Sequence, residues 1–177
     1  MKINILGAPG TGVTTLGKLL ALDTGFTHLD SDSYFWSDEG RPYEFERDKK
    51  ERDNMLTNDF NQHENIILTG AVFNWKLPFL NDFGLVVFLY LPKKKRIERL
   101  LAHEKEYYGD LLETDEWRKK EHHKFMECAS RYDEPNFESS QSLREQSEWI
   151  NQLISPVIRF EREYSFEEMI NEIKKQM

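Results

Sequence analysis

Residues 7–15 read GAPGTGVTT, and this stretch decides the fold. Its first eight letters follow the phosphate-binding pattern G-x-x-x-x-G-K-[ST], except that Val13 occupies the lysine position. The apolar run INIL (3–6) precedes it, and TTLGKLLALD (14–23) follows with apolar residues at helical spacing. A strand, a glycine turn and a helix in this order predict a phosphate site; a ligand-free turn is the alternative.

The binding chemistry of this loop is expected to come from its backbone. Gly7, Gly10 and Gly12 permit backbone angles that other residues avoid, and they let phosphates approach closely. Successive N–H groups then face the anion, and the helix N-terminus adds a favourable dipole. The Thr14 hydroxyl would ligate Mg²⁺, and Thr15 would bond a phosphate oxygen. The predicted phosphate contacts are Gly7, Pro9, Gly10, Thr11, Gly12, Val13, Thr14 and Thr15.

Val13 is expected to weaken catalysis more than binding. A charged hydrogen bond contributes about 1.5–3 kcal/mol, whereas the N–H groups and Thr14 need no lysine. Phosphoryl transfer spreads negative charge in the transition state, so a missing cation has more effect there. Lys18 lies one helical turn beyond Thr14, and we interpret it as a surface residue.

The rest of the chain alternates apolar strands with helical segments. Strand patterns are expected near 26–36, 65–73, 85–92 and 156–160. Helical patterns are expected at 44–62, 93–108, 114–131, 142–154 and 165–177, with Gly25 and Ser165 as helix-end signals. This alternation predicts a single α/β domain over residues 1–177, with a doubly wound five-stranded parallel sheet. Ligands in such folds bind at the carboxyl ends of the strands.

Composition restricts the class of protein. The 177 residues are 38% hydrophobic and 32% charged, and the net charge of −8 disfavours a nucleic-acid partner. A single cysteine, Cys128, excludes an internal disulfide framework and fits a reducing compartment. No apolar run approaches eighteen residues, so we expect a cytoplasmic protein without a membrane partner.

Two aspartates follow the second predicted strand. Asp30 and Asp32 would point to the same side of an extended segment, where they could serve a metal and a substrate hydroxyl. A polar turn with an Asx cap is the alternative. The third and fourth strands end at Thr69 and Tyr90 rather than at a metal-binding aspartate, so a metal would depend on this pair.

The loop, DSD (30–32), LTG (68–70) and the strand–proline–basic-helix unit resemble the adenylate-kinase-like group of P-loop NTPases. That group includes nucleoside monophosphate, shikimate and gluconate kinases, and HLDSDSYFW (28–36) looks closest to its topology modulation proteins. The resemblance covers residues 1–105 and the closing strand and helix, with a variant Walker A motif that lacks the lysine.

The resemblance implies roles for residues on the acceptor side. Asp30 would lie near the metal, Asp32 would act on the acceptor hydroxyl, and Gly70 would offer the acceptor a backbone contact. The helix at 44–62 would bind the acceptor, with Arg47 and Arg52 as candidate anion contacts.

The resemblance also implies a base site and a mobile lid. Arg99, seven residues after Pro92, would pack on the nucleotide base, but His103 replaces a second phosphate-binding arginine. Residues 104–140 would form a helical lid whose Arg118 could supply the missing catalytic charge. Other candidate cations are Lys105, Lys119, Lys120 and Arg131, for which a solvated helix face is the alternative. The basic run at 93–96 is interpreted as a helix face.

Together these features predict a protein that binds ATP or GTP with Mg²⁺. The leading hypothesis is a phosphotransferase that moves the γ-phosphate to a small-molecule or nucleotide acceptor. A non-catalytic nucleotide sensor is the alternative, and a loop that binds only phosphate or sulfate is a third. An acceptor pocket at Asp32 would favour transfer, whereas Trp36 or Phe73 filling that space would favour the sensor.

Overall fold

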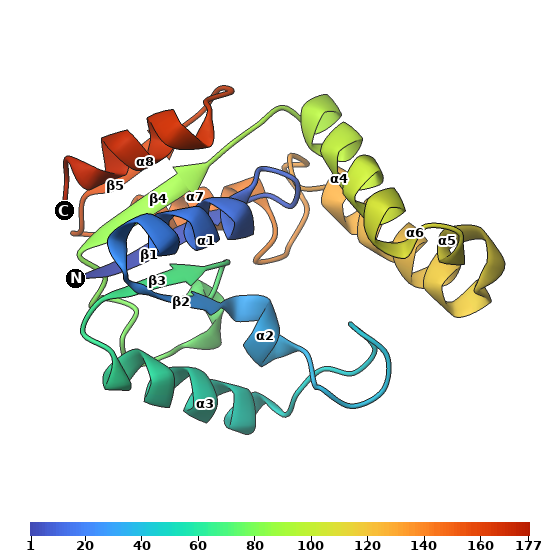
Figure 1. Ribbon diagram of the computed structural model, residues 1–177, viewed down its shortest axis with the longest axis horizontal. Helices are drawn as coiled ribbons and strands as arrows, with labels where there is room; N and C mark the ends of the chain where they lie inside the picture. Colours follow the sequence, from blue (N-terminus) through green and yellow to red (C-terminus); the bar gives the residue numbers. More distant parts are fainter.

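A five-stranded parallel sheet forms the centre of the computed structural model, which describes residues 1–177 (Figure 1). The strand order is β2-β3-β1-β4-β5, so the predicted α/β fold with five parallel strands is confirmed. The strands are β1 (Lys2–Gly7), β2 (Thr27–Asp30), β3 (Ile66–Thr69), β4 (Leu85–Leu89) and β5 (Val157–Phe160).

Helices cover the sheet and extend beyond it. They are α1 (Val13–Thr24), α2 (Ser31–Phe35), α3 (Lys49–Gln62), α4 (Lys93–Tyr108), α5 (Leu111–Thr114), α6 (Glu116–Ser130), α7 (Leu143–Ile150) and α8 (Phe166–Lys174), with a 3₁₀ turn at Phe73–Trp75. None of them combines the length and the apolar character that crossing a membrane requires.

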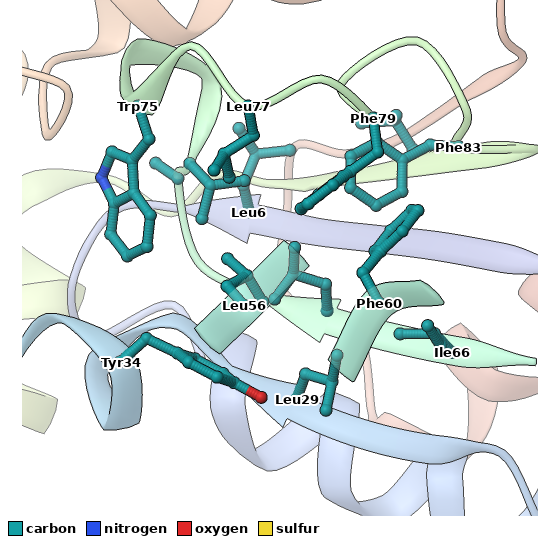
Figure 2. Packing of buried hydrophobic residues seen from close by; sticks show 14 of the residues in the cluster. Leu6, Leu29, Tyr34, Leu56, Phe60, Ile66, Trp75, Leu77, Phe79 and Phe83 are labelled. Atoms are coloured by element: carbon teal, nitrogen blue, oxygen red, sulfur yellow. The ribbon is translucent and has the colours of Figure 1, made fainter. Parts of the chain in front are cut away.

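Two apolar clusters hold the layers together, one on each face of the sheet. The first cluster joins β1 and β3 to α3, α7 and the segment 71–83, and Figure 2 shows Leu56 and Phe60 of α3 packed against it. Phe60 stacks on Phe79 with ring centroids 3.7 Å apart. The second cluster joins the opposite face to α1 and α8 through Leu16, Leu20 and other buried side chains. Both faces of the sheet are therefore covered and shielded from solvent, as is usual for parallel sheets.

Local signals in the sequence end the helices where expected. Gly25 adopts a left-handed conformation (φ 74°) after α1, and its N–H donates to the Ala21 carbonyl (2.9 Å). Ser165 and Glu168 form a reciprocal capping box at the start of α8.

Two predicted elements need correction. The strand expected within residues 26–36 runs into a short helix, α2, rather than into a loop, because the Asp30 side chain accepts the Asp32 N–H (3.2 Å) and caps it. The acceptor-side helix begins at Lys49 rather than 44, since Asp48 caps it by accepting the N–H groups of Lys50 and Glu51. Residues 36–48 instead form an irregular segment, which we call the acceptor loop.

One helical arm projects away from the sheet. The distal part of α4, with α5 and α6, extends to the side opposite the two chain termini (Figure 1). The predicted lid (104–140) corresponds to this arm and to the residues that follow α6. The acceptor loop approaches the same arm, so the region between them faces the carboxyl end of the sheet (Figure 1).

Candidate active site

The glycine loop leaves β1 at Gly7 and enters α1 at Val13. Gly10 and Gly12 both have positive φ angles, 84° and 95°, which glycine adopts without steric cost. Thr11 is buried and braces the turn, since its N–H and its hydroxyl both donate to the Ala8 carbonyl (3.2 and 2.7 Å). The loop geometry is therefore fixed by its own backbone.

This geometry leaves a series of backbone donors free. The Leu16 N–H is the first in α1 to bond the backbone, at the Gly12 carbonyl (2.8 Å), and no side chain caps the helix. From Gly10 to Thr15, the N–H groups without an acceptor in the chain belong to Gly10, Gly12, Val13, Thr14 and Thr15. Free N–H groups at a helix N-terminus are a binding site for phosphate oxygens.

Close packing explains why glycine is required at two positions of the loop, Gly7 and Gly10. A Cβ atom at Gly7 would lie 2.3 Å from the Leu89 carbonyl oxygen of β4. One at Gly10 would lie 2.6 Å from the Arg96 carbonyl oxygen in the first turn of α4. Because both obstacles are backbone atoms, the loop cannot accept side chains there without moving β4 or α4.

The side chains that open α1 divide into one apolar and two polar groups. Val13 packs against the second cluster, so the lysine position is occupied by an apolar contact. The hydroxyls of Thr14 and Thr15 make no hydrogen bond within the chain, and Thr15 is exposed. Both hydroxyls are thus available to a phosphate or a metal ion at the loop.

Asp30 and Asp32 lie at the same edge of the sheet, although not on one extended segment. The strand register places Asp30 beside Thr69 at the end of β3. Asp32 is exposed to solvent at the first turn of α2. Desolvation, with a smaller contribution from the Asp30 charge, raises the pKa of Asp32 to about 6.

Gly70 has its backbone groups engaged in the sheet edge. Its N–H donates to the Ile5 carbonyl (2.9 Å), and its carbonyl accepts from the Asn4 side chain (3.1 Å). A Cβ atom there would lie 1.8 Å from the Ser31 hydroxyl, and the φ angle is 107°. The acceptor contact predicted for Gly70 stays a prediction, and it would use the second lone pair of the carbonyl.

The predicted base-binding arginine lies beside the β5–α8 connection. Arg99 donates to the Glu163 carboxylate (2.8 Å), and Lys95 also pairs with Glu163 (3.3 Å). His103, one turn further along α4, is exposed and stacks on Tyr107 with ring centroids 6.2 Å apart. The base-stacking role of Arg99 stays a prediction, and it requires the arginine to exchange or share Glu163.

The lid arginine predicted to act in catalysis bonds the acceptor loop. Arg118 is buried, donates to the Pro42 carbonyl (2.9 Å), and lies over the Tyr108 ring at 4.0 Å. Beside it, Arg41 donates to both oxygens of Asp115 (2.9 Å each). We call the two contacts that join the lid to the acceptor loop, Arg118–Pro42 and Arg41–Asp115, the lid bridge. The other lid cations, Lys105, Lys119, Lys120 and Arg131, are exposed.

A buried arginine, Arg96, supports the glycine loop, and its burial was not predicted from the basic run 93–96. Arg96 is fully buried and donates to the carbonyls of Leu91 (3.0 Å) and Ala129 (3.1 Å) and to the Asp133 carboxylate. Its guanidinium also lies over the Tyr132 ring at 4.8 Å. Arg96 thus joins the helix that supports Gly10 to the end of α6. The basic run 93–96 looked like a helix face because no local pattern distinguishes Arg96 from its lysine neighbours.

Comparison with known proteins identifies the family of the chain. Residues 3–125, more than half of the chain, match the family described as AAA domain. The chain belongs to the AAA domain family. Over 173 residues it is 36% identical to an uncharacterized protein, YqaC of Bacillus subtilis, covering 97% of this chain and 94% of that protein. This AAA domain protein is therefore a P-loop protein over the region that contains the loop.

Enzymes with related sequence or fold are kinases of small molecules. Over 108 residues the AAA domain protein is 32% identical to a shikimate kinase of Psychrobacter arcticus, covering 55% of this chain and 58% of that enzyme. Its fold matches a deoxyadenosine kinase from M. mycoides with bound dATP, at a TM-score of 0.58 and 17% identity, covering 99% and 98% of the chains. The fold is that of small-molecule and nucleoside kinases.

Proposed function

We propose that this AAA domain protein is a phosphotransferase that moves the γ-phosphate of ATP or GTP to the hydroxyl of a small-molecule acceptor. One observation supports this most: the loop presents a run of free backbone N–H groups at the start of α1. These donors suit the β- and γ-phosphates of a nucleotide. A cytoplasmic location stays a prediction from the sequence.

The residues around the loop fit a magnesium ion. Thr14 offers a free hydroxyl and Asp30 a carboxylate, both oxygen donors of the kind that Mg²⁺ prefers. No group of three or more His, Cys, Asp or Glu residues could hold a metal by itself. This suits Mg²⁺, which takes few protein ligands and keeps phosphate and water oxygens. When bound, the ion would neutralise phosphate charge.

Asp32 is the candidate general base. With a pKa of about 6, it is mostly ionised at pH 7 and still basic enough to take a proton from an acceptor hydroxyl. The hydroxyl oxygen would bond the γ-phosphorus while the bond to the β–γ bridging oxygen breaks and the nucleoside diphosphate leaves. Of the two bulky residues considered near Asp32, Phe73 stacks on Trp149 (ring centroids 5.4 Å apart) and Trp36 ends the helix that contains Asp32.

Transition-state charge requires a cation that the loop lacks. The predicted contact between Arg118 and phosphate would require the lid bridge to rearrange, since Arg118 now bonds Pro42. A nucleotide sensor is the second candidate, and Val13 favours it because an apolar side chain at this position cannot neutralise a γ-phosphate.

A transfer assay separates the two candidates. Phosphate transfer from ATP and from GTP to a panel of nucleosides, nucleotides and polyols would be measured for wild type, Asp32→Asn and Val13→Lys. Asp82→Asn is the matched control, because Asp82 is an exposed carboxylate in the loop before β4. We expect Asp32→Asn to lose about a hundredfold or more in rate, Asp82→Asn to keep the rate, and Val13→Lys to raise it.

The same panel contains the contradicting results. Nucleotide binding without transfer by wild type and by Val13→Lys would replace the phosphotransferase with the sensor. Absence of nucleotide binding by both proteins would remove both candidates.

A further inference from the structure

Both arginines expected to bind an anionic acceptor, Arg47 and Arg52, are occupied by the protein itself. Arg52 is buried and donates to the Asp53 carboxylate (2.7 Å). Arg47 donates to the carbonyls of Tyr34 (3.1 Å) and Trp36 (3.0 Å). The carboxylates of Asp38 and Glu51 lie within 3.3 Å of its guanidinium. Its side chain is only 10% exposed, so it holds the start of the acceptor loop rather than offering a free cation.

The two arginines of the lid bridge are engaged in the same way. Arg41 has a bidentate partner in Asp115, and Arg118 bonds the Pro42 carbonyl while it stacks on Tyr108. A bidentate carboxylate neutralises a guanidinium and occupies the edge that would bind another anion. An acceptor carboxylate or phosphate would have to displace these contacts.

Carboxylates dominate the remaining charge on this side. Asp30 and Asp32 lie at the end of β2. A hollow of about 460 Å³ under the acceptor loop is lined by Asp38, Glu39, Glu46, Asp48 and Glu51 together with Arg47. An anionic acceptor that approached Asp32 would meet like charge, which disfavours its binding.

Aromatic rings stand next to Asp32. Trp36 ends the helix that contains Asp32, and its N–H donates to the Asp32 carbonyl (3.0 Å). The Tyr43 ring meets the Trp36 ring edge-to-face at 5.8 Å. Tyr43 is 45% exposed and has a φ of 67°, a left-handed conformation that is a true outlier for a bulky residue.

The lid places further rings opposite Tyr43. Burial raises the pKa of the Tyr43 phenol, and the nearby charges of Asp32 and the lid residue Tyr107 raise it further. Tyr107 packs edge-to-face on Tyr108 (4.7 Å). Arg118 bonds the Pro42 carbonyl next to Tyr43 and lies over the Tyr108 ring. Rings of the acceptor loop and of the lid therefore come close together on the Asp32 side, and we call them the aromatic walls.

We propose that the acceptor is an uncharged alcohol bearing a flat ring, of the nucleoside class, whose ring packs against Trp36 and Tyr43 while its hydroxyl reaches Asp32. This rests on the phosphotransferase function proposed above. The hydroxyl proton passes to the Asp32 carboxylate, the oxygen bonds the γ-phosphorus, and ADP or GDP leaves with the β–γ bridging oxygen. An acceptor with a neutral ring would explain why the walls are aromatic. An acceptor without an anionic group would explain why the arginines are free to bond the protein itself.

Matched acceptor pairs test the proposal. Ribonucleosides and 2′-deoxynucleosides would be compared with their 5′-monophosphates, and with shikimate and gluconate, at fixed Mg²⁺ and ATP or GTP. We expect kcat/KM for the best nucleoside to exceed that for its monophosphate, and those for both acids, by about tenfold or more. Tyr43→Leu and Trp36→Leu should each raise the KM for the nucleoside about tenfold while ATP binding is unchanged. Phe45→Leu, an exposed aromatic in the same loop, should leave the KM unchanged.

Two outcomes contradict the proposal in distinguishable ways. Faster transfer to a monophosphate, to shikimate or to gluconate than to any nucleoside overturns the acceptor class and leaves the phosphotransferase standing. ATP or GTP binding with no transfer to any acceptor overturns the phosphotransferase and the acceptor class together.

Discussion

The two sides of the site are held by different forces. On the nucleotide side, Gly7 and Gly10 touch backbone carbonyls, and the fully buried Arg96 ties the supporting helix to the end of α6. On the acceptor side, the acceptor loop meets the lid through Arg41 and Asp115, whose side chains are 52% and 29% exposed. Exposed ion pairs are weak and screened by salt, whereas buried networks are costly to break.

This difference predicts different mechanical roles. The nucleotide side is expected to keep its shape with or without ligand, because its positions are fixed by backbone contacts and buried bonds. The acceptor side is expected to open and close more readily, since its Arg41–Asp115 pair contributes about 1 kcal/mol or less, and opening would also release the buried Arg118 from Pro42.

Arg96→Ala should cause the largest loss of stability. It leaves two carbonyls and the Asp133 carboxylate without their donor, and breaking a buried ion pair costs about 3–5 kcal/mol. Chemical denaturation would measure the change in the free energy of unfolding. Arg99→Ala, on the same helix but 42% exposed, is the control and should lose about 1 kcal/mol or less. Equal losses in the two variants would show that the nucleotide side is no more firmly held.

Gly10→Ala should come next. An alanine at this position would keep the positive φ, and its Cβ would lie 2.6 Å from the Arg96 carbonyl oxygen. Backbone strain and steric overlap together should lower the free energy of unfolding by about 2–4 kcal/mol. Gly25→Ala is a matched control, because it has φ 74° and no atom within 4 Å, so about 1 kcal/mol is expected. Thermal unfolding of both variants would compare them. A loss in Gly10→Ala no larger than in Gly25→Ala would mean that the loop packs loosely.

The two sides also differ in how much of them could be predicted from the sequence. Gly25, Ser165 and the glycine loop act through neighbours a few residues away, so pattern and capping rules located them. The buried state of Arg96 and the pairing of Arg41 with Asp115, 74 residues apart, depend on tertiary packing. Sequence patterns do not encode such distant contacts, so the acceptor side is the less predictable half.

Within the acceptor side, local chemistry also misled the prediction for the aspartate pair. Asp30 and Asp32 were expected on one extended face, but the Asp30 carboxylate captures the Asp32 N–H and turns the chain into α2. An aspartate before a serine-rich turn favours such a cap over further strand. The position of Asp32 at the carboxyl end of the sheet was still anticipated.

Asp32 should give the protein a defined pH dependence. Because folding raises the pKa of this carboxyl from 3.8 to about 6, the folded state binds more protons between these values. Stability contributed by Asp32 therefore falls as pH rises from about 4 to about 6, and Asp32→Asn should unfold at a higher temperature than wild type at pH 7. Below about pH 4 the difference should vanish.

The same titration should control activity. If Asp32 acts as the base, kcat/KM should rise about tenfold per pH unit below pH 6 and level off above it. A profile without an inflection near pH 6, or an Asp32→Asn variant that unfolds at a lower temperature at pH 7, would contradict the assigned environment.

Removal of the Arg41–Asp115 contact of the lid bridge should have the smallest effect on the free energy of unfolding. Arg41→Gln and Asp115→Asn, combined in a double-mutant cycle, should give a coupling of about 0.2–1 kcal/mol that declines with salt. Asparagine keeps the α6 cap, in which Asp115 accepts the Arg118 N–H (2.8 Å). Hydrogen exchange in residues 36–48 should accelerate in both single variants. A coupling of zero between Arg41 and Asp115 at low salt, with unchanged hydrogen exchange in residues 36–48, would show that this pair does not hold the acceptor loop to the lid.

The central claim is that the loop binds nucleotide phosphate through its backbone, without a lysine. Calorimetric titration of Mg²⁺–ATP and Mg²⁺–GTP into wild type, Gly10→Ala and Gly25→Ala tests it most directly, at a temperature where all three proteins are folded. We predict a dissociation constant between about 1 µM and about 1 mM for wild type with the preferred nucleotide, the same value for Gly25→Ala, and no detectable binding to Gly10→Ala. Binding to Gly10→Ala as tight as to wild type, or no binding to wild type, would contradict the account.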